Sequence, residues 1–499
     1  MEKPNILLIV TDTHRWDALN CMGSTFAKSP GIDGLAARGT LFEQGHTSSP
    51  VCCPARCSLL TGFHTPVHGC IENGIRRRLD VPVFTDGLKT AGYTNIMVGK
   101  AHFGPVPDSF DVQRIIQGEK GGDPDDFYAE HIRERGFSRS SAYPNPIPPE
   151  LFMDAFLADT TIGEIEKIRE KNAGPFFAFC SMPSPHSPVD PPGNWAELYD
   201  HTDLPPLNYT QGEIDLHPPQ LRRLVGTMDP AATAAEPRTG YTDGEFEHLR
   251  EAVGNTIIGK DSADIDRYRK LYYGLAAYCD HQVGRLIDYL DSTGLREDTL
   301  VIFTSDHGQQ LFDHGFNDKH NFFDESFRVP FIMSQPGVIP QGARRDFAIW
   351  NDITATVLAA AGADHSWVQG FDLYAPLSAN LPSPRTCAVA SVYRSMAVAT
   401  GRWKLEYFID EDEGRLFNRK LDPLEHTDLY TDPSHRAVRD RLLHSLLTWR
   451  ADIVDVNYLH EHTVGGGPVA KRVKRMVGTM LGRHSEERLQ ERIKDLDDA

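Results

Sequence analysis

A cysteine, a proline and an arginine occur in the order Cys-x-Pro-x-Arg within the segment VCCPARCSLLTG, residues 51–62. The pattern predicts a helix that begins at Pro54, because a proline at the first helical position loses no hydrogen bond. Cys52 would then lie just outside the positive end of the helix dipole, where an anionic group is stabilised. Arg56, one turn into the helix, would offer a permanently charged set of donors to an oxyanion. The segment therefore predicts a nucleophile at Cys52 beside an anion-binding arginine.

Two other interpretations of these cysteines stay open. Cysteine and histidine, which are common zinc ligands, are frequent in this region. A zinc cluster would draw on Cys52, Cys53, Cys57, His64, His68 and Cys70. The spacing disfavours it, because the paired Cys-x-x-Cys knuckles of strong zinc motifs are missing. The second alternative is an unmodified thiol nucleophile, as in cysteine hydrolases.

Strand-like and helix-like segments alternate along the chain around these residues. Short apolar runs rich in β-branched and aromatic residues occur at residues 5–10, 94–98, 176–181 and 300–304. Helical periodicity occurs between them, at residues 31–38, 54–60, 83–91 and 263–292. The order predicts an α/β fold with a large mixed, mostly parallel sheet sandwiched by helices.

Polar side chains follow each of the four predicted strands. They are Asp12 after the first, Lys100 and His102 after the second, His186 after the third, and Asp306 and His307 after the fourth. A single such residue is usually a turn or cap residue. Because ligands of open parallel sheets bind at the carboxyl ends of the strands, the joint occurrence predicts one functional site at that edge.

The residue types at this edge suit an anionic ester and a metal. Asp12, Asp306 and His307 offer carboxylate and imidazole ligands to a hard divalent cation. An ester anion that gains charge during transfer needs fixed positive groups. We expect these from Lys100, Lys319 and Arg56, with His102 and His186 as further donors.

Several segments together resemble the sulfatase family. CCPAR followed by SLLTG is similar to the family signature, in which the first cysteine is oxidised to formylglycine. NILLIVTDTHRWDAL and TSDHG resemble its two metal-binding segments. GYTNIMVGKAHFG, PFFAFCSMPSPHSPVDPP and DKHNFFDESFRVPFI resemble the segments that present a lysine and histidine two apart, a histidine for the leaving group, and a second lysine. The likeness spans residues 5–330 and resumes at 403–433.

The resemblance implies a metal site made of Asp12, Asp306, His307 and a hydroxyl of the formylglycine at position 52. It implies calcium first, with manganese or magnesium as alternatives. One position departs from the family pattern: the residue after the first aspartate is Thr13, where sulfatases generally have Asp or Gln. A hydroxyl is a weaker and shorter ligand, so we expect Thr13 to contribute together with a water or another side chain.

The mechanism that the resemblance implies gives each remaining residue a role. Hydrated formylglycine would attack sulfur through one hydroxyl, which loses its proton with help from Asp306. His186, with Lys319, would protonate or stabilise the departing oxygen. His102 would take the proton of the second hydroxyl, so that the aldehyde reforms and sulfate leaves, while Arg56 and Lys100 hold the diol and the anion. A formylglycine-generating maturation enzyme is the partner that this chemistry requires.

The substrate stays open at the level of sequence. A carbohydrate sulfate is the first hypothesis, and aryl or small alkyl sulfates are alternatives. A phosphonate monoester or phosphodiester hydrolase on the same scaffold is a second hypothesis, and a noncatalytic, zinc-structured binding protein is a third.

Net charge and hydropathy limit the binding partners and the cellular location that the sequence predicts. A net charge of −19 over 499 residues disfavours nucleic acid and anionic membranes as partners. The apolar run near the N-terminus covers only residues 6–10, which is too short for a signal peptide or a membrane span. With eight irregularly spaced cysteines, this predicts a cytoplasmic protein with free thiols.

Changes in pattern along the chain suggest three parts. We expect a catalytic α/β domain over residues 1–380, with insertions rich in Pro, Gly and Asp at 105–150 and 203–250 forming long surface loops. Alternating strands and a helix around residues 435–449 predict a small antiparallel sheet subdomain over residues 381–455. Residues 456–499 predict a helical tail, interpreted as a solvated helix, with an oligomerisation arm or a lid as alternatives.

Overall fold

A computed structural model describes residues 3–116, 126–139, 142, 144–171, 174–222, 256–461 and 485–498. Parts of both predicted insertions and much of the predicted tail lie outside these residues. In the described part of the chain, no helix is both long and apolar enough to cross a membrane.

Two sheets carry the fold. The first has eight strands in the order β4-β3-β5-β1-β6-β7-β2-β8, and the second has four strands in the order β12-β11-β10-β9. In the first sheet β4, β3, β5, β1 and β6 run parallel, whereas β7 is antiparallel to both β6 and β2. The predicted class, a mixed and mostly parallel sheet with helices plus a smaller antiparallel sheet, is confirmed.

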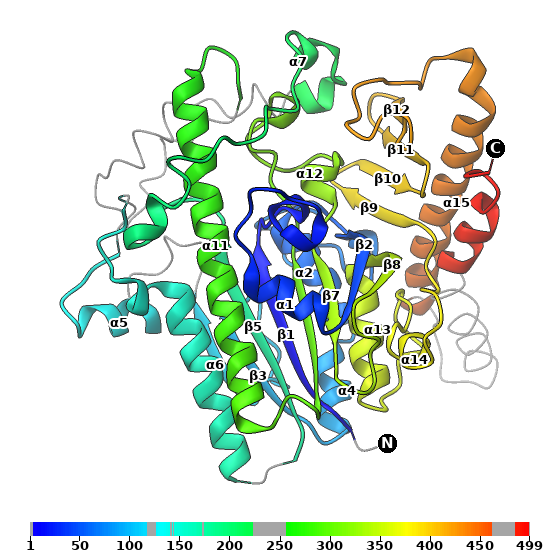
Figure 1. Cartoon of the computed structure of the whole chain (residues 1–499). Coiled ribbons are helices and arrows are strands. Elements are labelled where there is room, and N and C mark those ends of the chain that lie inside the picture. The colour runs from blue at the N-terminus through cyan, green and yellow to red at the C-terminus, as the bar shows by residue number, and fades with distance from the viewer. Residues whose placement is uncertain are drawn as a thin grey trace, which may run out of the picture. The chain divides into compact units, whose positions relative to one another are not determined.

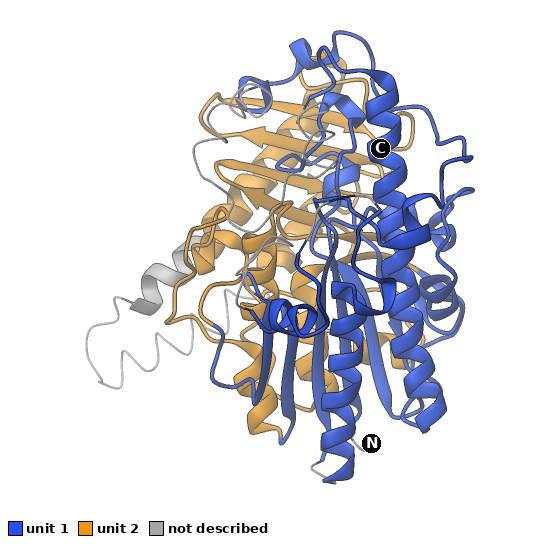
Figure 2. Cartoon of the chain, turned by 90° about the vertical axis from the view of Figure 1, so that its left-hand side faces the viewer, with its two compact units in different colours: residues 1–43, 92–102, 106–344 blue, residues 44–91, 103–105, 345–499 orange. Residues whose placement is uncertain are grey.

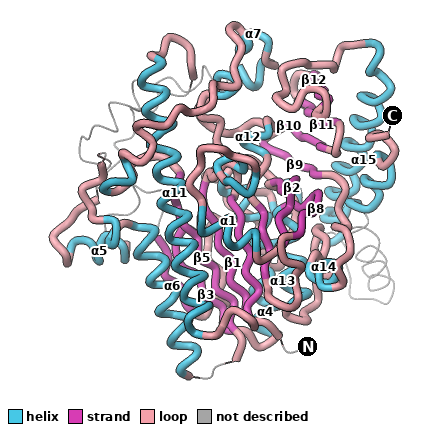
Figure 3. The backbone as a smooth tube through the Cα atoms, viewed as in Figure 1, coloured by secondary structure: helices cyan, strands magenta, loops and turns pink. Residues whose placement is uncertain are grey.

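The strands, shown in magenta in Figure 3, have the following bounds. They are β1 Asn5–Asp12, β2 Thr40–His46, β3 Thr94–Lys100, β4 Val112–Ile116, β5 Phe176–Pro185, β6 Thr299–Ser305, β7 Phe331–Ser334, β8 Ala343–Ile349, β9 Ala388–Val392, β10 Ser395–Ala399, β11 Trp403–Phe408 and β12 Glu413–Asn418.

The α-helices of the described residues are labelled in part in Figure 1. They are α1 Pro30–Ala37, α2 Cys52–Thr61, α3 Thr65–His68, α4 Phe84–Thr90, α5 Phe127–Arg133, α6 Met153–Glu170, α7 Glu213–Leu216, α11 Ser262–Thr293, α12 Asp324–Phe327, α13 Trp350–Ala360, α14 Tyr374–Ser378 and α15 Arg436–Glu461. All four strands and all four helices predicted for the first 310 residues are present, with ends shifted by a few residues.

The chain divides into two compact units, coloured in Figure 2. The first unit comprises Met1–Glu43, Gly92–His102 and Val106–Arg344, and the second comprises Gln44–Ala91, Phe103–Pro105 and Arg345–Ala499. Both are discontinuous in sequence. The boundaries that the sequence predicts, near residues 380 and 455, stay a prediction.

In the first unit, helices α1 and α6 pack on α11, and both α6 and α11 pack on the parallel strand β5. Helix α11 packs against α1, α6 and β5, and Figure 1 shows α11 and α6 running along the strands. The apolar positions predicted to form the inner face of α11 are at most 1% exposed: Leu271, Leu275, Val283, Leu286 and Leu290. All of these except Leu271 join Leu7 and Ile9 of β1 in one core, and Leu271 belongs to a second apolar cluster. This core fixes where the strands end, and so where the site residues lie.

The predicted loop at residues 105–150 contains more regular structure than expected. It includes the edge strand β4, the short helix α5 and residues that lead into α6. Helix α6 was also absent from the predicted elements. The apolar residues of this helix are spaced among many polar ones, and tertiary packing of Leu157 and Ile165 against the sheet decides its structure.

The second unit contains the small antiparallel sheet. Helix α15 covers it, as predicted, and residues 485–493 form a further helix on the same core. The interpretation of the terminal helix as solvated is wrong for these residues, because Leu489 and Ile493 are 0% and 3% exposed. Leu489 and Ile493 are four residues apart and, together with Leu496, form a narrow apolar stripe. The many charged residues around them make this stripe hard to detect in the sequence.

Candidate active site

Three predicted metal ligands lie together where β1 and β6 end. One ligand atom from each of Asp12, Asp306 and His307 lies within 4.8 Å of the others, and all three residues are 0% exposed. The parallel register, with Thr11 opposite Ser305, brings the two strand ends side by side. The convergence predicted from sequence is therefore present for these three residues in the first unit.

Backbone contacts fix the orientation of the Asp306 carboxylate. Its Oδ1 accepts hydrogen bonds from the N–H of Thr13 at 3.1 Å and from the N–H of His307 at 3.0 Å. The Asp306 N–H in turn donates to the Thr11 carbonyl at 3.2 Å. The loops that follow β1 and β6 are thus joined directly through Asp306.

The residues present fit a hard divalent cation. Two carboxylates and an imidazole are fully removed from water here, and a divalent cation bound to them would compensate the carboxylate charge. The hydroxyl of Thr13 supports this fit, since its Oγ1 is buried and has no hydrogen-bond partner among the residues that the structure describes. Thr13 also has a positive φ of 61°, a strained conformation for a β-branched residue that persists where the surroundings enforce it.

Lys100 lies against the same group. Its Nζ is 2.7 Å from the Asp12 Oδ2, and the side chain is 1% exposed. Lys100 is the last residue of β3, so its position follows from the strand as expected. His102 lies two residues beyond the end of this strand and has a positive φ of 51°. A left-handed residue no longer obeys the alternation of a strand.

A second basic pair lies in the first unit. His186 follows β5, and its Nε2 is 3.0 Å from the Nζ of Lys319. The Nδ1 of His186 donates to the carbonyl of Ser187 at 2.7 Å, so the neutral ring uses Nε2 as the acceptor for the lysine. Lys319 and His186 are 8% and 7% exposed. The structure thus brings together the two residues assigned to the leaving group.

Asp318 adds a negative charge beside this pair. Its carboxylate is 3.6 Å from the Lys319 Nζ. Burial acts to raise the pKa of Asp318, but the charges of Lys319, His320 and His186 outweigh burial and lower the pKa to about 2. Asp318 is therefore ionised at neutral pH and places a negative charge beside the Lys319 ammonium.

Sequence reasoning missed the side chains that hold the two loops in place. The Arg15 guanidinium forms a bidentate ion pair with Asp17 and a second pair, at 2.7 Å, with Asp313 in the loop after β6. The Tyr272 hydroxyl donates to the carbonyl of Thr13 at 2.6 Å and accepts the N–H of Arg15 at 2.9 Å. The Arg-x-Asp spacing within the first metal segment is a usable signal for Arg15, whereas nothing near Tyr272 in the sequence indicates its role.

Cys52 and Arg56 belong to the second unit. Helix α2 begins at Cys52 itself, so the prediction that it begins at Pro54 is wrong by two residues. The first N–H groups of a helix have no intrahelical acceptor, so Pro54 at the third position loses no bond. Both Cys52 and Arg56 are 0% exposed. A buried guanidinium is stable where anions or carbonyl oxygens accept its hydrogen bonds.

The zinc-cluster interpretation finds no support in the described residues. The Nε2 of His64 pairs with Glu486 at 2.7 Å, and the Nε2 of His68 bonds the Ser58 hydroxyl at 2.9 Å. Burial lowers the pKa of His68 to about 3, so its ring is neutral. Both imidazoles are thus engaged in structural contacts within the second unit.

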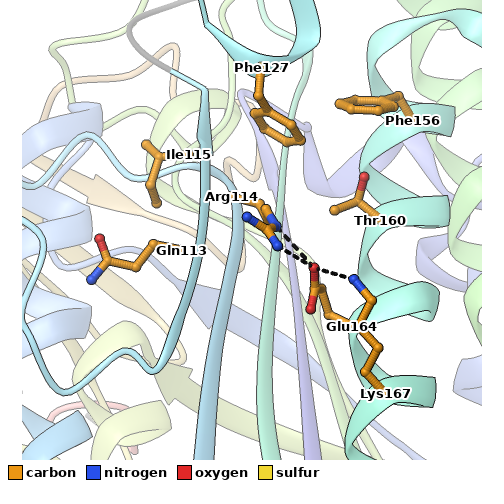
Figure 4. A pocket seen from close by; sticks show the side chains of 8 residues that line it. All are labelled: Gln113, Arg114, Ile115, Phe127, Phe156, Thr160, Glu164 and Lys167. Carbon is orange, nitrogen blue, oxygen red and sulfur yellow. Dashed lines mark hydrogen bonds and ion pairs between the residues drawn. The ribbon is translucent and has the colours of Figure 1, made fainter. Parts of the chain in front are cut away.

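A cavity of about 540 Å³ lies elsewhere in the first unit, between the edge strand β4 and helices α5 and α6. Figure 4 shows the rings of Phe127 and Phe156 at one end and Glu164 paired with Arg114 and Lys167 at the other. The residues that line this cavity include no predicted site residue. The candidate active site therefore rests on the convergence at the strand ends.

Comparison with known proteins identifies the family. The Sulfatase family model matches residues 4–363, and the model "N-sulphoglucosamine sulphohydrolase, C-terminal" matches residues 312–452. The choline-sulfatase of Rhizobium meliloti is 28% identical over 459 residues, which cover 86% of this chain and 83% of that protein. The N-acetylglucosamine-6-O-sulfatase of Bacteroides thetaiotaomicron is 25% identical over 496 residues, covering 89% of this chain and 86% of the relative.

Among solved structures, the phosphonate monoester hydrolase of Agrobacterium radiobacter superimposes with a TM-score of 0.75. The match covers 90% of this chain and 96% of the other, at 23% identity. At this identity the likeness establishes the shared fold.

Proposed function

We propose that this chain, which belongs to the sulfatase family and is a sulfatase, hydrolyses the sulfate ester of a carbohydrate and uses Cys52, converted to formylglycine, as its nucleophile. The observation that carries the proposal is the buried group of Asp12, Asp306 and His307 with the ammonium of Lys100 against it. We propose that Cys52 joins this group as its fourth member.

A divalent metal fits this group, and when bound it would lower the pKa of a coordinated hydroxyl and neutralise charge on the ester. Asp12, Asp306 and His307 would hold it, with the Thr13 hydroxyl as a further ligand. Calcium suits two carboxylates and a hydroxyl, and manganese or magnesium are the alternatives. Lys100 would bind the sulfate oxygens while its contact with Asp12 fixes its own position.

The formylglycine would supply a pair of hydroxyls on one carbon, one to attack sulfur and one to let the sulfate leave. The chain's own groups then move the protons. In this proposal the His186–Lys319 pair gives a proton to the departing alcohol oxygen, and His102 accepts the proton of the second hydroxyl. Arg56 contributes a fixed positive charge that stabilises the anion.

A carbohydrate substrate is supported by two features. One relative, matched over 86% of its length, is named as an N-acetylglucosamine-6-O-sulfatase, and the C-terminal family model is that of an N-sulphoglucosamine sulphohydrolase. A sugar alcohol is a poor leaving group, and a site with two basic side chains at 3.0 Å suits its protonation. Choline sulfate and aryl sulfates are the competing substrates.

The first experiment measures the peptide of residues 39–56, which trypsin releases from protein coexpressed with a formylglycine-generating enzyme. Conversion replaces the thiol of Cys52 by an aldehyde, and fragmentation distinguishes it from the neighbouring Cys53. An unmodified Cys52 in a fully active preparation would overturn the proposed nucleophile.

The second experiment compares rates on sulfated monosaccharides, choline sulfate, an aryl sulfate and an aryl phosphonate monoester. The proposal expects kcat/KM to be highest for a sulfated sugar. A strong preference for the phosphonate monoester would instead assign the chain to the phosphonate hydrolase activity.

A further inference from the structure

Two tyrosines of helix α11 approach the candidate site from the same side. Tyr268 and Tyr272 are one helical turn apart and are 2% and 1% exposed. The Tyr272 hydroxyl contacts Thr13 and Arg15 in the loop directly after Asp12. The Tyr268 hydroxyl contacts a different segment, the one that carries His186. One helix therefore reaches both halves of the site through phenol oxygens.

Tyr268 is linked to both members of the basic pair through their neighbours. Its hydroxyl is 3.2 Å from the Ser187 Oγ, directly after His186. A side-chain hydrogen bond with Asn317 ties the same hydroxyl to the segment that contains Lys319. Because His186 and Lys319 come from loops after different strands, a single donor–acceptor group between those loops fixes the distance between the two side chains.

The surroundings make this anchor rigid. The Tyr268 ring packs edge-on to Phe312, with centroids 5.9 Å apart, inside an apolar cluster of the first unit. The Lys319 segment needs such an anchor, since Phe312, His314 and His320 all have positive φ values between 53° and 76°. Residues held in that region relax unless tertiary contacts retain them.

We propose that Tyr268 is a positioning residue that holds the His186–Lys319 pair in register for protonation of the leaving group. The proposal rests on the proposed function, because it assumes that this pair serves the departing oxygen. It adds the expectation that Tyr268 matters most for substrates whose leaving group is a weak acid, such as a sugar or alkyl alcohol. For a strongly acidic phenol, protonation contributes little and the position of the pair matters less.

The test compares Tyr268→Phe with Tyr278→Phe, both of which remove one buried hydroxyl from α11. The Tyr278 hydroxyl donates to the Pro149 carbonyl, away from the basic pair. Each variant is assayed on aryl sulfates of equal shape, from 4-nitrophenyl sulfate to 4-methylphenyl sulfate, and on a sulfated sugar. We expect Tyr268→Phe to lower kcat by roughly tenfold more for the poor leaving groups than for 4-nitrophenyl sulfate, the factor that one hydrogen bond contributes.

The crystal structures of the two variants give a readout that does not need turnover. The Lys319 Nζ to His186 Nε2 distance should increase in Tyr268→Phe and stay at 3.0 Å in Tyr278→Phe. An unchanged distance, or an equal loss of rate for good and poor leaving groups, would overturn the inference while the sulfatase activity stands. A wild-type protein that releases no sulfate from any ester would instead contradict the proposed function, and the crystallographic comparison would still decide the role of Tyr268.

Discussion

Asp306 is the residue through which the two halves of the candidate metal group are joined. Its carboxylate accepts two backbone N–H groups, and its own N–H binds the strand end of β1. Hydrogen bonds of this kind favour the ionised carboxylate, which is the form that binds a cation. At the scale of single residues, the chemistry of the site therefore depends on a few buried charges with fixed orientations.

Removing this carboxylate should remove the metal. We expect Asp306→Ala to lose bound metal and activity together, because one of two ligand carboxylates and the link to Thr13 disappear. Metal content by mass spectrometry and the chelator-induced change in Tm provide the measurement. The wild-type Tm should fall when the metal is removed, whereas the variant should show no such response. Wild-type metal content in the variant would exclude Asp306 as a ligand.

Cys52 and Cys57 offer a matched pair of buried thiols, 0% and 1% exposed. Cys52→Ala should abolish turnover, because alanine cannot be converted to the aldehyde. Cys57→Ala should reduce stability by about 1 kcal/mol with little effect on kcat, as expected for a small buried side chain. Rates on a sulfate ester and urea unfolding separate the two effects. Turnover by Cys52→Ala at the wild-type rate would reject the nucleophile assignment.

At the scale of elements, the spacing between strands β3 and β5 determines where Lys100 lies. Gly99 precedes Lys100, has a φ of 99° and pairs with Ser181 of β5. A Cβ at this position would lie 2.0 Å from the Ser181 carbonyl oxygen, a distance that no side chain tolerates. Only glycine lets the two strands approach while the chain turns Lys100 toward Asp12.

Gly99→Ala should therefore destabilise the protein by about 2–4 kcal/mol, from steric overlap added to backbone strain. Gly92→Ala is the control, because Gly92 has a φ of 90° but a Cβ there would meet nothing within 4 Å. Its cost should be about 1 kcal/mol, from strain alone. Urea unfolding measures both free energies. Equal losses for the two variants would show that the close contact with Ser181 is not limiting.

At the scale of the whole molecule, the last described segment of the chain completes the core of the second unit. Glu486 lies fully buried and binds Arg385 at 2.8 Å, His64 at 2.7 Å and the Trp449 indole at 3.0 Å. Arg385 also forms a bidentate pair with Asp352. Residues more than 400 positions apart in sequence are thus held by one carboxylate.

This carboxylate should make the fold sensitive to acid. Burial opposes ionisation, but the charges of Arg385 and His64 outweigh it and lower the pKa of Glu486 from 4.5 to about 2. A lowered pKa means that the stabilisation is complete above about pH 4.5 and is lost as the pH falls toward 2. Glu486→Gln should cost about 3 kcal/mol at neutral pH and flatten this acid dependence.

The control for this variant is Glu491→Gln. Glu491 is exposed and forms a surface ion pair with Lys494, three residues further on, so its loss should change stability by less than about 1 kcal/mol. Unfolding free energies between pH 3 and 7 give the comparison. Parallel pH curves for wild type and Glu486→Gln would contradict the assigned role.

The sequence by itself determined the parallel sheet and the strand-end residues Asp12, Lys100, His186 and Asp306. Strand periodicity and the polar residue that follows each strand are local signals, and parallel strands necessarily align their carboxyl ends. Cys52 and Lys319 were found in a second way, because the motifs around them resemble those of the sulfatase family.

Tertiary structure alone decided what holds these residues in place. The hydroxyls of Tyr268 and Tyr272, the Arg15–Asp313 pair and the docking of Glu486 join segments that are far apart in sequence. Helix α6 also depends on packing that no local window records. Contacts of this kind arise only when the chain is folded, because their partners are selected by distance in space and leave no regular spacing in the sequence.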